Sequence, residues 1–341
     1  PNIEYASLYV QGRKMEEVIP DYLKEDWEAV ANRLLSFRRS LGIGKVDVSS
    51  NCIFDLLPKR FLLEFCEVKN NITQHVLENY PKPQRYKYLL KVCQMLEDIE
   101  NTPLKINQPR LAGFLKEDPQ DRRLSRLSPY IRYNQFGTRT GRLSTRPHSF
   151  PILTLPKKHR SIIEPKNDYF IELDFNGAEV RVLLGLLGKD QPEGDVHDFH
   201  SRKVFEGSKS AESRKFSTTL ENFYNKEEVL DQYWDGKKVY TPYRKTIENV
   251  DEHHALNYIV QSTCAELTLL QALKIKHMLA ARSATTYISC IIHDAIVLDF
   301  SQDDLPYLRD IIKLMQSTKF GQFKVNITQG YNLGEMREMR Y

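Results

Sequence analysis

Two aspartates, Asp174 and Asp294, stand where apolar runs typical of buried strands meet turns. Such a placement can bring two carboxylates together beside open solvent. Because like charges at close range repel, a pair of this kind needs a cation. Two hard divalent ions, bound by both carboxylates and by a backbone carbonyl such as that of Phe175, would suit phosphoryl transfer by in-line displacement. Either aspartate alone is more typical of a turn or a cap, so the inference depends on the pair.

A second signal lies upstream, in the 42 residues from Arg122 to Ile163, which include no acidic side chain. This stretch carries ten fixed positive charges with aromatic residues between them. The whole chain is nearly balanced, with 49 basic and 45 acidic residues and a net charge of +4. The local excess predicts contact with a polyanion, and the interleaved aromatic residues favour nucleic acid over a merely solvated basic face.

Local patterns place both aspartates. Residues 169–175 alternate as a strand does and residues 177–187 are helical, so Asp174 lies at a strand–helix junction. Residues 287–300 predict two apolar strands hinged at His293-Asp294-Ala295, with Asp294 at the tip of the hairpin. The other expected elements are two long antiparallel helices over 59–100, an irregular segment over 122–166, a polar and mostly helical stretch over 195–254, and helices over 26–37, 254–281 and 305–316.

Five short motifs, in this order, resemble those of family A DNA polymerases, the class of bacterial polymerase I and many phage replicases. They are Gly137–Thr145 (GTRTGRLST), Leu173–Arg181 (LDFNGAEVR), Asp195–His197 (DVH), Asn257–Thr263 (NYIVQST) and Ile292–Asp294 (IHD). Each motif alone is weak, whereas five in the right order after a thumb-like helix pair are specific. The resemblance runs from about Leu56 to the C-terminus and is nearest to a phage-type member.

The resemblance implies a reaction and a metal site. Asp174 and Asp294 match the family's metal-binding catalytic aspartates, and the carbonyl of Phe175 would be a further ligand. Two Mg²⁺ ions are the implied cofactors, which would lower the pKa of the primer 3′-hydroxyl, align it with the α-phosphorus of the incoming deoxynucleotide, and stabilise the leaving pyrophosphate. The implied enzyme is a DNA-directed DNA polymerase, which takes primer-template DNA and dNTPs as its substrates.

The resemblance also implies contacts to the nucleotide. Glu179 matches the glutamate that discriminates between sugars, and His197 matches the histidine that meets the nucleotide phosphates. Arg214 begins a segment that resembles the start of the fingers helix, which supplies cations for the triphosphate. These three residues are the predicted dNTP-binding set.

Five residues are predicted to contact DNA. Arg142 matches the arginine that reads the minor-groove edge at the primer terminus. Asn257 and Gln261 match the amides that contact the template–primer minor groove, where the acceptors are common to all correct pairs. Arg139 belongs to the same basic segment as Arg142, and His293 is expected near the primer-terminal phosphate.

The fingers depart from the family pattern. Only Ser210–Lys215 resembles the fingers helix, and Phe216 then follows abruptly. Asp174 and Asp294 lie 120 residues apart, several tens fewer than the family usually has. Either the chain is a degenerate polymerase that cannot hold a nucleotide, or a fingers helix between Lys215 and Phe216 is missing from the sequence. The intact motifs on both sides favour the second explanation.

Two single positions depart as well. Ala295 follows His293-Asp294, where polymerase I-like members often have a glutamate that assists the metal site without being indispensable. His253 stands four residues before Asn257, where many members carry an arginine, which weakens one expected DNA contact.

The expected fold class is α+β, in the right-hand polymerase fold: a helical thumb, a palm with a small antiparallel sheet, and helical fingers that are partly missing. The predicted parts are an N-terminal connector or remnant of an upstream domain over 1–55, a thumb over 56–125, a first palm segment over 126–194, fingers over 195–254 and a second palm segment over 255–341.

Two other functions share some of these features. A single-subunit RNA polymerase has the palm and a His-Asp turn, but Glu179 argues against it. A template–primer binding module with a vestigial active site agrees with Ala295 and the short fingers.

The stretch Asp98-Ile99-Glu100 imitates a proofreading exonuclease motif, but a helical pattern precedes it. No exonuclease is therefore expected in this chain, and these residues should end a thumb helix.

Length and composition narrow the expected number of domains and the expected location of the protein. The 341 residues suit two or three domains, and no apolar run approaches the ~18 residues of a membrane helix. Acidic residues near the start replace the apolar core of a signal peptide, so the expected location is intracellular, in the cytoplasm of a bacterial host if the chain is phage-encoded. A processivity factor or an upstream replication domain is a further candidate partner. Five widely spaced cysteines predict reduced core thiols, neither disulfides nor a zinc site.

Overall fold

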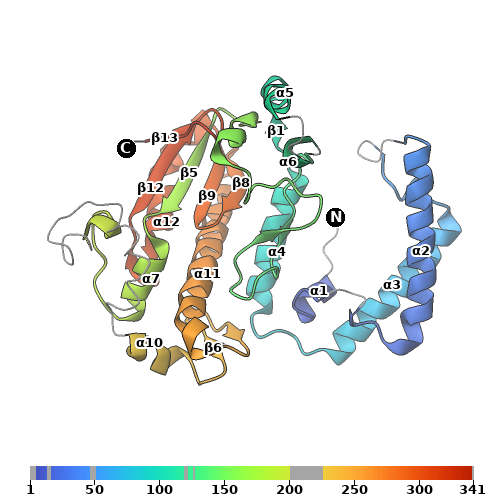
Figure 1. Ribbon diagram of the computed structural model, residues 1–341, viewed down its shortest axis with the longest axis horizontal. Coiled ribbons are helices and arrows are strands. Elements are labelled where there is room, and N and C mark those ends of the chain that lie inside the picture. The colour runs from blue at the N-terminus through green and yellow to red at the C-terminus, as the bar shows by residue number, and fades with distance from the viewer. Residues whose placement is uncertain are drawn as a thin grey trace. The chain divides into compact units, whose positions relative to one another are not determined.

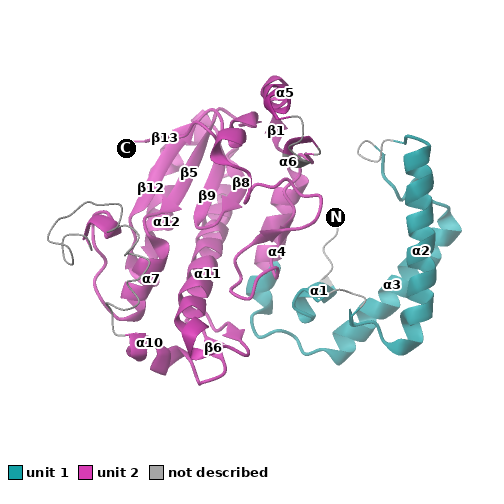
Figure 2. Ribbon diagram, in the orientation of Figure 1, with its two compact units in different colours: residues 1–90 teal, residues 91–341 magenta. Residues whose placement is uncertain are grey.

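The computed structural model describes residues 5–13, 17–46, 51–118, 122–125, 127–199 and 226–339. The chain forms two compact units, Pro1–Leu90 and Lys91–Tyr341 (Figure 2). The division falls inside helix α4 (Tyr86–Asn101). Within the described ranges, no helix combines the length and the apolar character needed to cross a membrane.

The first unit is helical, with α1 (Tyr5–Tyr9), α2 (Asp21–Ile43) and α3 (Lys59–Asn79). Helices α2 and α3 run antiparallel, because Val30 clusters with Phe61 and Phe65 near the start of α3, whereas Leu23 clusters with Ile72 near its end. The sequence predicts two long helices over 59–100, and both form, as α3 and α4. Within the first unit α2 packs against the buried face of α3, a contact that the sequence did not predict. An apolar stripe shows that a helix is covered but not by which element.

The second unit is built on a five-stranded antiparallel sheet in the order β13-β12-β5-β9-β8 (Figure 1). Its strands are β5 (Tyr169–Phe175), β8 (Tyr287–Ile292), β9 (Ala295–Phe300), β12 (Val325–Gly330) and β13 (Arg337–Glu338). The central strand β5 pairs with β9 on one side and β12 on the other. The expected combination of helices with a small antiparallel sheet is confirmed.

Three helices adjoin the sheet. Helix α7 (Ala178–Leu186) follows β5 directly, and α11 (Glu252–Ala281) packs against α7, α12 (Leu308–Gln316), β8 and β9. The carboxylate of Asp251 caps α11 by accepting a hydrogen bond from the amide of His254 at 3.0 Å. The sequence predicts helices over 177–187 and 254–281, and α7 and α11 begin within two residues of the predicted starts. Helix ends are commonly uncertain by one or two residues.

The remaining elements are short. They are helices α5 (Gln108–Glu117), α6 (Arg122–Ser125) and α10 (Lys226–Tyr233), the 3₁₀ helices η2 (Lys157–Ile162) and η4 (Gln302–Tyr307), and the paired strands β1 (Lys105–Ile106) with β4 (Ile163–Glu164), β2 (Tyr133–Asn134) with β3 (Ser144–Thr145), β6 (Val239–Tyr240) with β7 (Thr246–Ile247), and β10 (Ser317–Thr318) with β11 (Gly321–Gln322). Within the described part of 195–254, the β6–β7 hairpin is an element that the sequence did not predict.

The cysteines differ partly from expectation. Cys264 and Cys290 are buried, as predicted, but Cys52 and Cys66 are exposed. Cys66 lies on α3, whose buried face carries larger apolar side chains, and Cys52 lies in the segment before this helix. All five cysteines are free thiols.

Candidate active site

A cavity of about 650 Å³ lies where β5, α7, α11 and the β8–β9 turn meet. Eight residues that the sequence predicts for the site line it together: Arg142, Asp174, Phe175, Glu179, His197, Asn257, Gln261 and Asp294. They come from segments that are far apart in the chain, so the tertiary fold, and not chain proximity, assembles them.

The two aspartates reach this cavity from neighbouring strands. Asp174 on β5 pairs with Ala295 at the start of β9, and Asp294 directly precedes Ala295 in the two-residue turn after β8. The other turn residue, His293, has a φ of 55°, the left-handed conformation that tight hairpin turns use. The strand register therefore brings both carboxylates to the same end of the sheet.

The surroundings of both carboxylates disfavour their charged forms. Burial raises the pKa of Asp174 to about 6, and the negative charges of Glu172 and Asp294 contribute to the shift. Burial also raises the pKa of Asp294, although the positive charge of Arg142 opposes this. Oδ1 of Asp294 is buried and has no hydrogen-bond partner among the described residues. A buried carboxylate oxygen without a partner is costly unless a ligand satisfies it.

These groups fit a magnesium site with few protein ligands. Mg²⁺ is usually bound by one or two carboxylates, while substrate phosphates and water complete its shell. Asp174, Phe175 and Asp294 line the cavity, and the two carboxylates and the Phe175 carbonyl are the oxygen groups that could serve as ligands. In the described ranges, no three or more His, Cys, Asp or Glu side chains form a group that could hold a metal by themselves. Phosphate or water oxygens would therefore be needed beside the two carboxylates.

Arg142 places a positive charge among these acidic groups. Its Nη2 donates a hydrogen bond to Oε1 of Glu179 at 2.5 Å. The backbone that carries Arg142 is held by Thr138, whose hydroxyl donates to the Arg142 carbonyl at 2.8 Å, and turns at Gly141 with a φ of 84°. Arg142, predicted to meet the primer terminus, and Glu179, predicted to select the sugar, thus form an ion pair with each other in this structure.

Gly177 joins β5 to α7 in a conformation that favours glycine. Its φ is 62°, and a Cβ there would lie 2.2 Å from Cγ1 of Val196 and 3.4 Å from Nε2 of His197. The segment that carries His197 can approach the end of β5 only because no side chain stands between them.

We expect Gly177→Ala to lower the free energy of unfolding by about 2–5 kcal/mol, because the left-handed conformation costs roughly 1–2 kcal/mol and overpacking roughly 1–3 kcal/mol. Gly188→Ala is the matched control, since Gly188 also has a φ of 62° but nothing within 4 Å of its Cβ position. Denaturant unfolding measures both variants. Equal losses of stability would contradict the steric part of the argument.

Helix α11 presents two predicted DNA contacts to the cavity. Asn257 and Gln261 lie one helical turn apart, both half-buried, and line the cavity with Leu256 and Val260. His253, one turn earlier, is exposed. The face of α11 that carries the predicted amides therefore turns toward the aspartates.

Two predicted DNA contacts lie outside the cavity lining. Arg139 donates hydrogen bonds to the carbonyls of Glu248 and Asn249, and its guanidinium lies 5.1 Å from the ring centre of Tyr258. Its charge is thereby tied to the loop before α11. The side chain of His293 is exposed on the β8–β9 turn.

The structure describes part of the predicted fingers. Arg214 and the junction between Lys215 and Phe216 lie outside the described residues. Of the range 195–254, the structure describes residues 195–199 and 226–254.

The residues that imitate an exonuclease motif end a helix, as predicted. Asp98 and Glu100 lie in the last turns of α4. Asp98 forms an ion pair with Lys276 on α11, and Oε1 of Glu100 lies 3.4 Å from Nε of Arg132. Both carboxylates therefore serve contacts between elements of the second unit.

Sequence reasoning missed two residues that brace the site. Arg181, predicted only as part of a motif, is fully buried. The hydroxyl of Tyr133 donates to the carbonyl of Ile291 at 2.6 Å and accepts from the Ile291 amide at 3.0 Å, which fixes β8 just before the turn with Asp294. The sequence signal that could have identified Arg181 is its position as a charged residue within the apolar pattern of 178–187.

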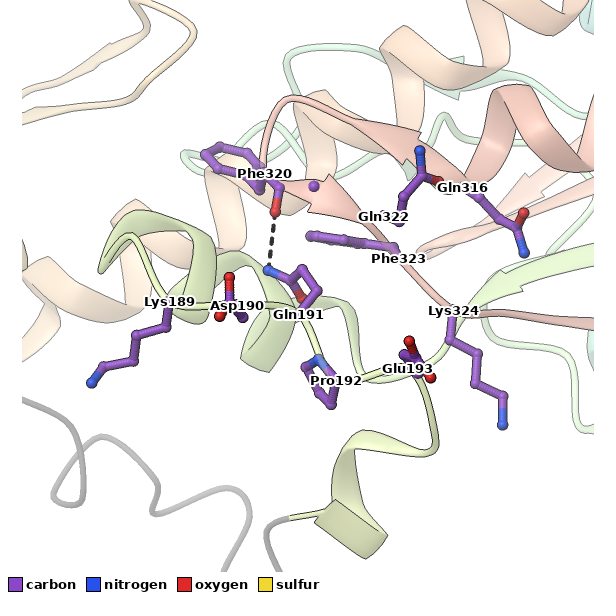
Figure 3. Close-up of a pocket in the computed structure, with 11 residues that line it drawn as sticks. Lys189, Asp190, Gln191, Pro192, Glu193, Gln316, Phe320, Gln322, Phe323 and Lys324 are labelled. Carbon is purple, nitrogen blue, oxygen red and sulfur yellow. Dashed lines mark hydrogen bonds between the residues drawn. The ribbon is translucent and has the colours of Figure 1, made fainter.

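A second cavity, of about 680 Å³, lies between residues 189–193 and the β10–β11 turn (Figure 3). Its charged side chains, such as Lys189, Glu193 and Lys324, are exposed and of mixed sign. It contains neither of the two aspartates nor any other predicted site residue. The smaller cavity at the end of β5 is therefore the candidate active site.

Comparison with known proteins supports a fold assignment. No family model matches the chain, and no curated protein matches it. Among solved structures it is similar to the POL domain of Pol1 from M. smegmatis in complex with DNA primer-template and dNTP, with a TM-score of 0.57 and 11% sequence identity, over 80% of this chain and 75% of that chain. The chain therefore has a DNA polymerase-like fold.

Proposed function

We propose that this chain is a DNA-directed DNA polymerase of the family A type, which extends a primer 3′-hydroxyl with dNTPs by two-metal-ion nucleotidyl transfer. The observation that carries the proposal is the single cavity in which Asp174 and Asp294 meet Glu179, His197 and Arg142. The DNA polymerase-like fold supports it, because the similar solved domain was found with primer-template and dNTP.

In this proposal Asp174, Asp294 and the carbonyl of Phe175 would hold two Mg²⁺ ions, whose chemistry would be to lower the pKa of the primer 3′-hydroxyl and to neutralise charge on the transferred phosphoryl group. The two carboxylates suit this task because burial disfavours their charged forms until a cation compensates. The buried Oδ1 of Asp294, which has no hydrogen-bond partner among the described residues, would gain one from a bound cation.

The chain also orients both substrates. Arg142 and Glu179 exchange their mutual ion pair for contacts to the primer end and the incoming sugar. Asn257 and Gln261 donate amide hydrogens to minor-groove acceptors shared by all correct pairs, which checks geometry and not sequence. The basic segment over 122–163 neutralises backbone phosphates, so binding should weaken as salt rises.

The finer assignments belong to the same proposal. The thumb spans 56–125, the palm 126–194 and 255–341, and the fingers 195–254. We propose a phage-type member that acts in the cytoplasm of a bacterial host, that carries no proofreading exonuclease in this chain, and that works with a processivity factor or an upstream replication domain.

Extension of a labelled primer on a DNA template in the presence of Mg²⁺ and dNTPs tests the proposal. Elongation by template-directed deoxynucleotides supports it. Primer-template binding without metal-dependent elongation would instead identify a binding module with a vestigial site, which Ala295 favours because it supplies no third carboxylate. Preferred use of ribonucleotides would identify an RNA polymerase.

Protons and divalent cations should compete at the aspartates. The pKa of Asp174 is about 6 in the folded chain against a usual 3.8, so folding favours its protonated form, and metal-free stability should rise as the pH falls from about 7 toward 4. Mg²⁺ needs the charged form, so its apparent affinity should fall below about pH 6.

Calorimetric Mg²⁺ titrations at about pH 7.5 and pH 5.5 measure the affinity, and unfolding curves at the same values measure the stability. Asp174→Asn is the control for the unfolding curves, because its neutral side chain does not titrate and its stability should rise less as the pH falls. An affinity that does not change with pH would contradict the prediction.

A further inference from the structure

Arg181 lies in the interior of the second unit, and no step of the proposed reaction uses it. It is fully buried, and an arginine is costly to bury unless its donors are satisfied. Its guanidinium makes four hydrogen bonds. Nε donates to the carbonyl of Asn176 at 2.7 Å, Nη1 to that of Pro192 at 2.8 Å, and Nη2 to that of Gly194 at 2.7 Å and to Oδ1 of Asn176 at 3.3 Å.

These partners connect the turn after β5 to the segment that carries His197. Oδ1 of Asn176 accepts from the amide of Val196 at 2.9 Å, and its Nδ2 donates to Oδ2 of Asp195 at 2.7 Å. Oδ1 of Asp195 accepts from the amides of His197 at 2.9 Å and Asp198 at 3.0 Å, as a helix cap does. An unbroken series of hydrogen bonds therefore links Arg181 to the backbone of His197.

Gln191 holds the outer side of the same segment. Its Nε2 donates to the carbonyl of Arg181 at 2.9 Å and to the carbonyl of Phe320 at 3.1 Å, and Figure 3 shows the second bond. The loop over 189–194 is thus tied both to α7 and to the β10–β11 turn.

The residue at the end of this network faces the candidate active site. The ring of His197 lines the cavity, with Nε2 only 3.4 Å from the Cβ position of Gly177, three residues after Asp174. Its Nδ1 is buried without a hydrogen-bond partner in the described part of the chain. A buried ring nitrogen without a partner is rare unless a ligand or water completes it.

We propose that Arg181 is the positioning residue for His197: it holds residues 192–198 through Asn176 and Asp195, so that the imidazole is aimed at the nucleotide phosphates before they arrive. The inference rests on the proposed function, because it takes nucleotide phosphates as the ligand of His197. Arg181 makes no contact to substrate in this scheme. It lowers the cost of ordering the site on binding.

Hydrogen exchange in the ligand-free protein tests the positioning independently of any polymerase activity. In Arg181→Met, the amides of Val196, His197 and Asp198 should exchange about tenfold faster or more, because a lost hydrogen bond to a charged group is worth ~1.5–3 kcal/mol. The amides of β9 should keep their protection. Unchanged exchange at 196–198, or an equal increase in β9, would overturn the proposal.

A double-mutant cycle tests the link to His197. His197→Ala and Arg181→Met should each raise the KM for dNTP about tenfold with little change in primer-template affinity, and the double variant should be no worse than His197→Ala. Additive losses would overturn the proposal, since they indicate general damage. Arg181→Lys should behave like Arg181→Met, because lysine keeps the charge without the planar fork.

Two further variants keep the cycle decisive. If Arg181→Met does not fold, Asp195→Ala replaces it, since this change removes the cap and leaves the buried arginine in place. Arg282→Met is the matched control, as Arg282 pairs with Asp310 at 2.6 Å at the far end of α11 and should leave the KM unchanged. If the wild-type protein extends no primer, the proposed function fails, and the exchange experiment alone decides the positioning role.

Discussion

Replacing Asp174 or Asp294 by asparagine should reduce primer extension by about 10³-fold or more. In the proposed reaction several kcal/mol of charge stabilisation would depend on metal ions held by these carboxylates, and each ~1.4 kcal/mol is a factor of ten in rate. Asparagine preserves the size of the side chain, removes its charge and replaces one of the two carboxylate oxygens by an amide NH₂. The affinity for primer-template should change little, because in the proposed function the basic segment over 122–163 supplies the main contacts to backbone phosphates.

The same variants should be more stable than the wild-type protein without metal. Burial raises the pKa of both aspartates, so their charges cost folding free energy at neutral pH that asparagine does not. Asp303→Asn, at an exposed position on η4, is the control and should alter neither activity nor stability. Single-turnover extension, DNA binding and denaturant unfolding measure the three effects. Equal loss of DNA binding and extension would show that the aspartates are structural.

Glu179→Ala should relax sugar selection by about tenfold or more, since a side chain over the 2′ position rejects a hydroxyl by filling its space. Oε1 of Glu179 pairs with Arg142, which holds the carboxylate at the cavity rim in this structure. The measurement is the ratio of kcat/KM for a dNTP and the matching ribonucleotide.

Glu179→Gln separates shape from charge. Glutamine fills the same volume but loses the ion pair with Arg142, so discrimination should persist if selection is steric. Equal discrimination in the wild-type protein and Glu179→Ala would remove Glu179 from the sugar-binding role. If both Glu179→Ala and Glu179→Gln relax the discrimination between deoxy- and ribonucleotides, sugar selection depends on the charge of the Glu179–Arg142 pair and not on shape.

Local patterns accounted for the elements nearest the aspartates. The alternation over 169–175 and the helical periodicity after Gly177 predicted β5 and α7, and the apolar runs on either side of His293-Asp294 predicted the β8–β9 hairpin. Such signals are reliable because period and turn chemistry depend on side chains within a few positions of each other.

Longer-range pairing was less predictable. The packing of α2 against α3 was not predicted, because several helices of this chain have similar apolar stripes and a stripe does not identify the element that covers it. The β6–β7 hairpin was missed because its strands have two residues each, too few for a periodic signal.

The sequence by itself determined which side chains could perform the chemistry and the order in which they occur, from Arg142 to Asp294. Only the tertiary structure decided that Asp174 and Asp294 share one cavity, that Arg142 pairs with Glu179, and that a buried Arg181 holds the segment before His197. The physical reason is that these relations depend on strand register and burial. Register joins residues more than a hundred positions apart, and burial sets the energy of a charge through atoms that no local pattern includes.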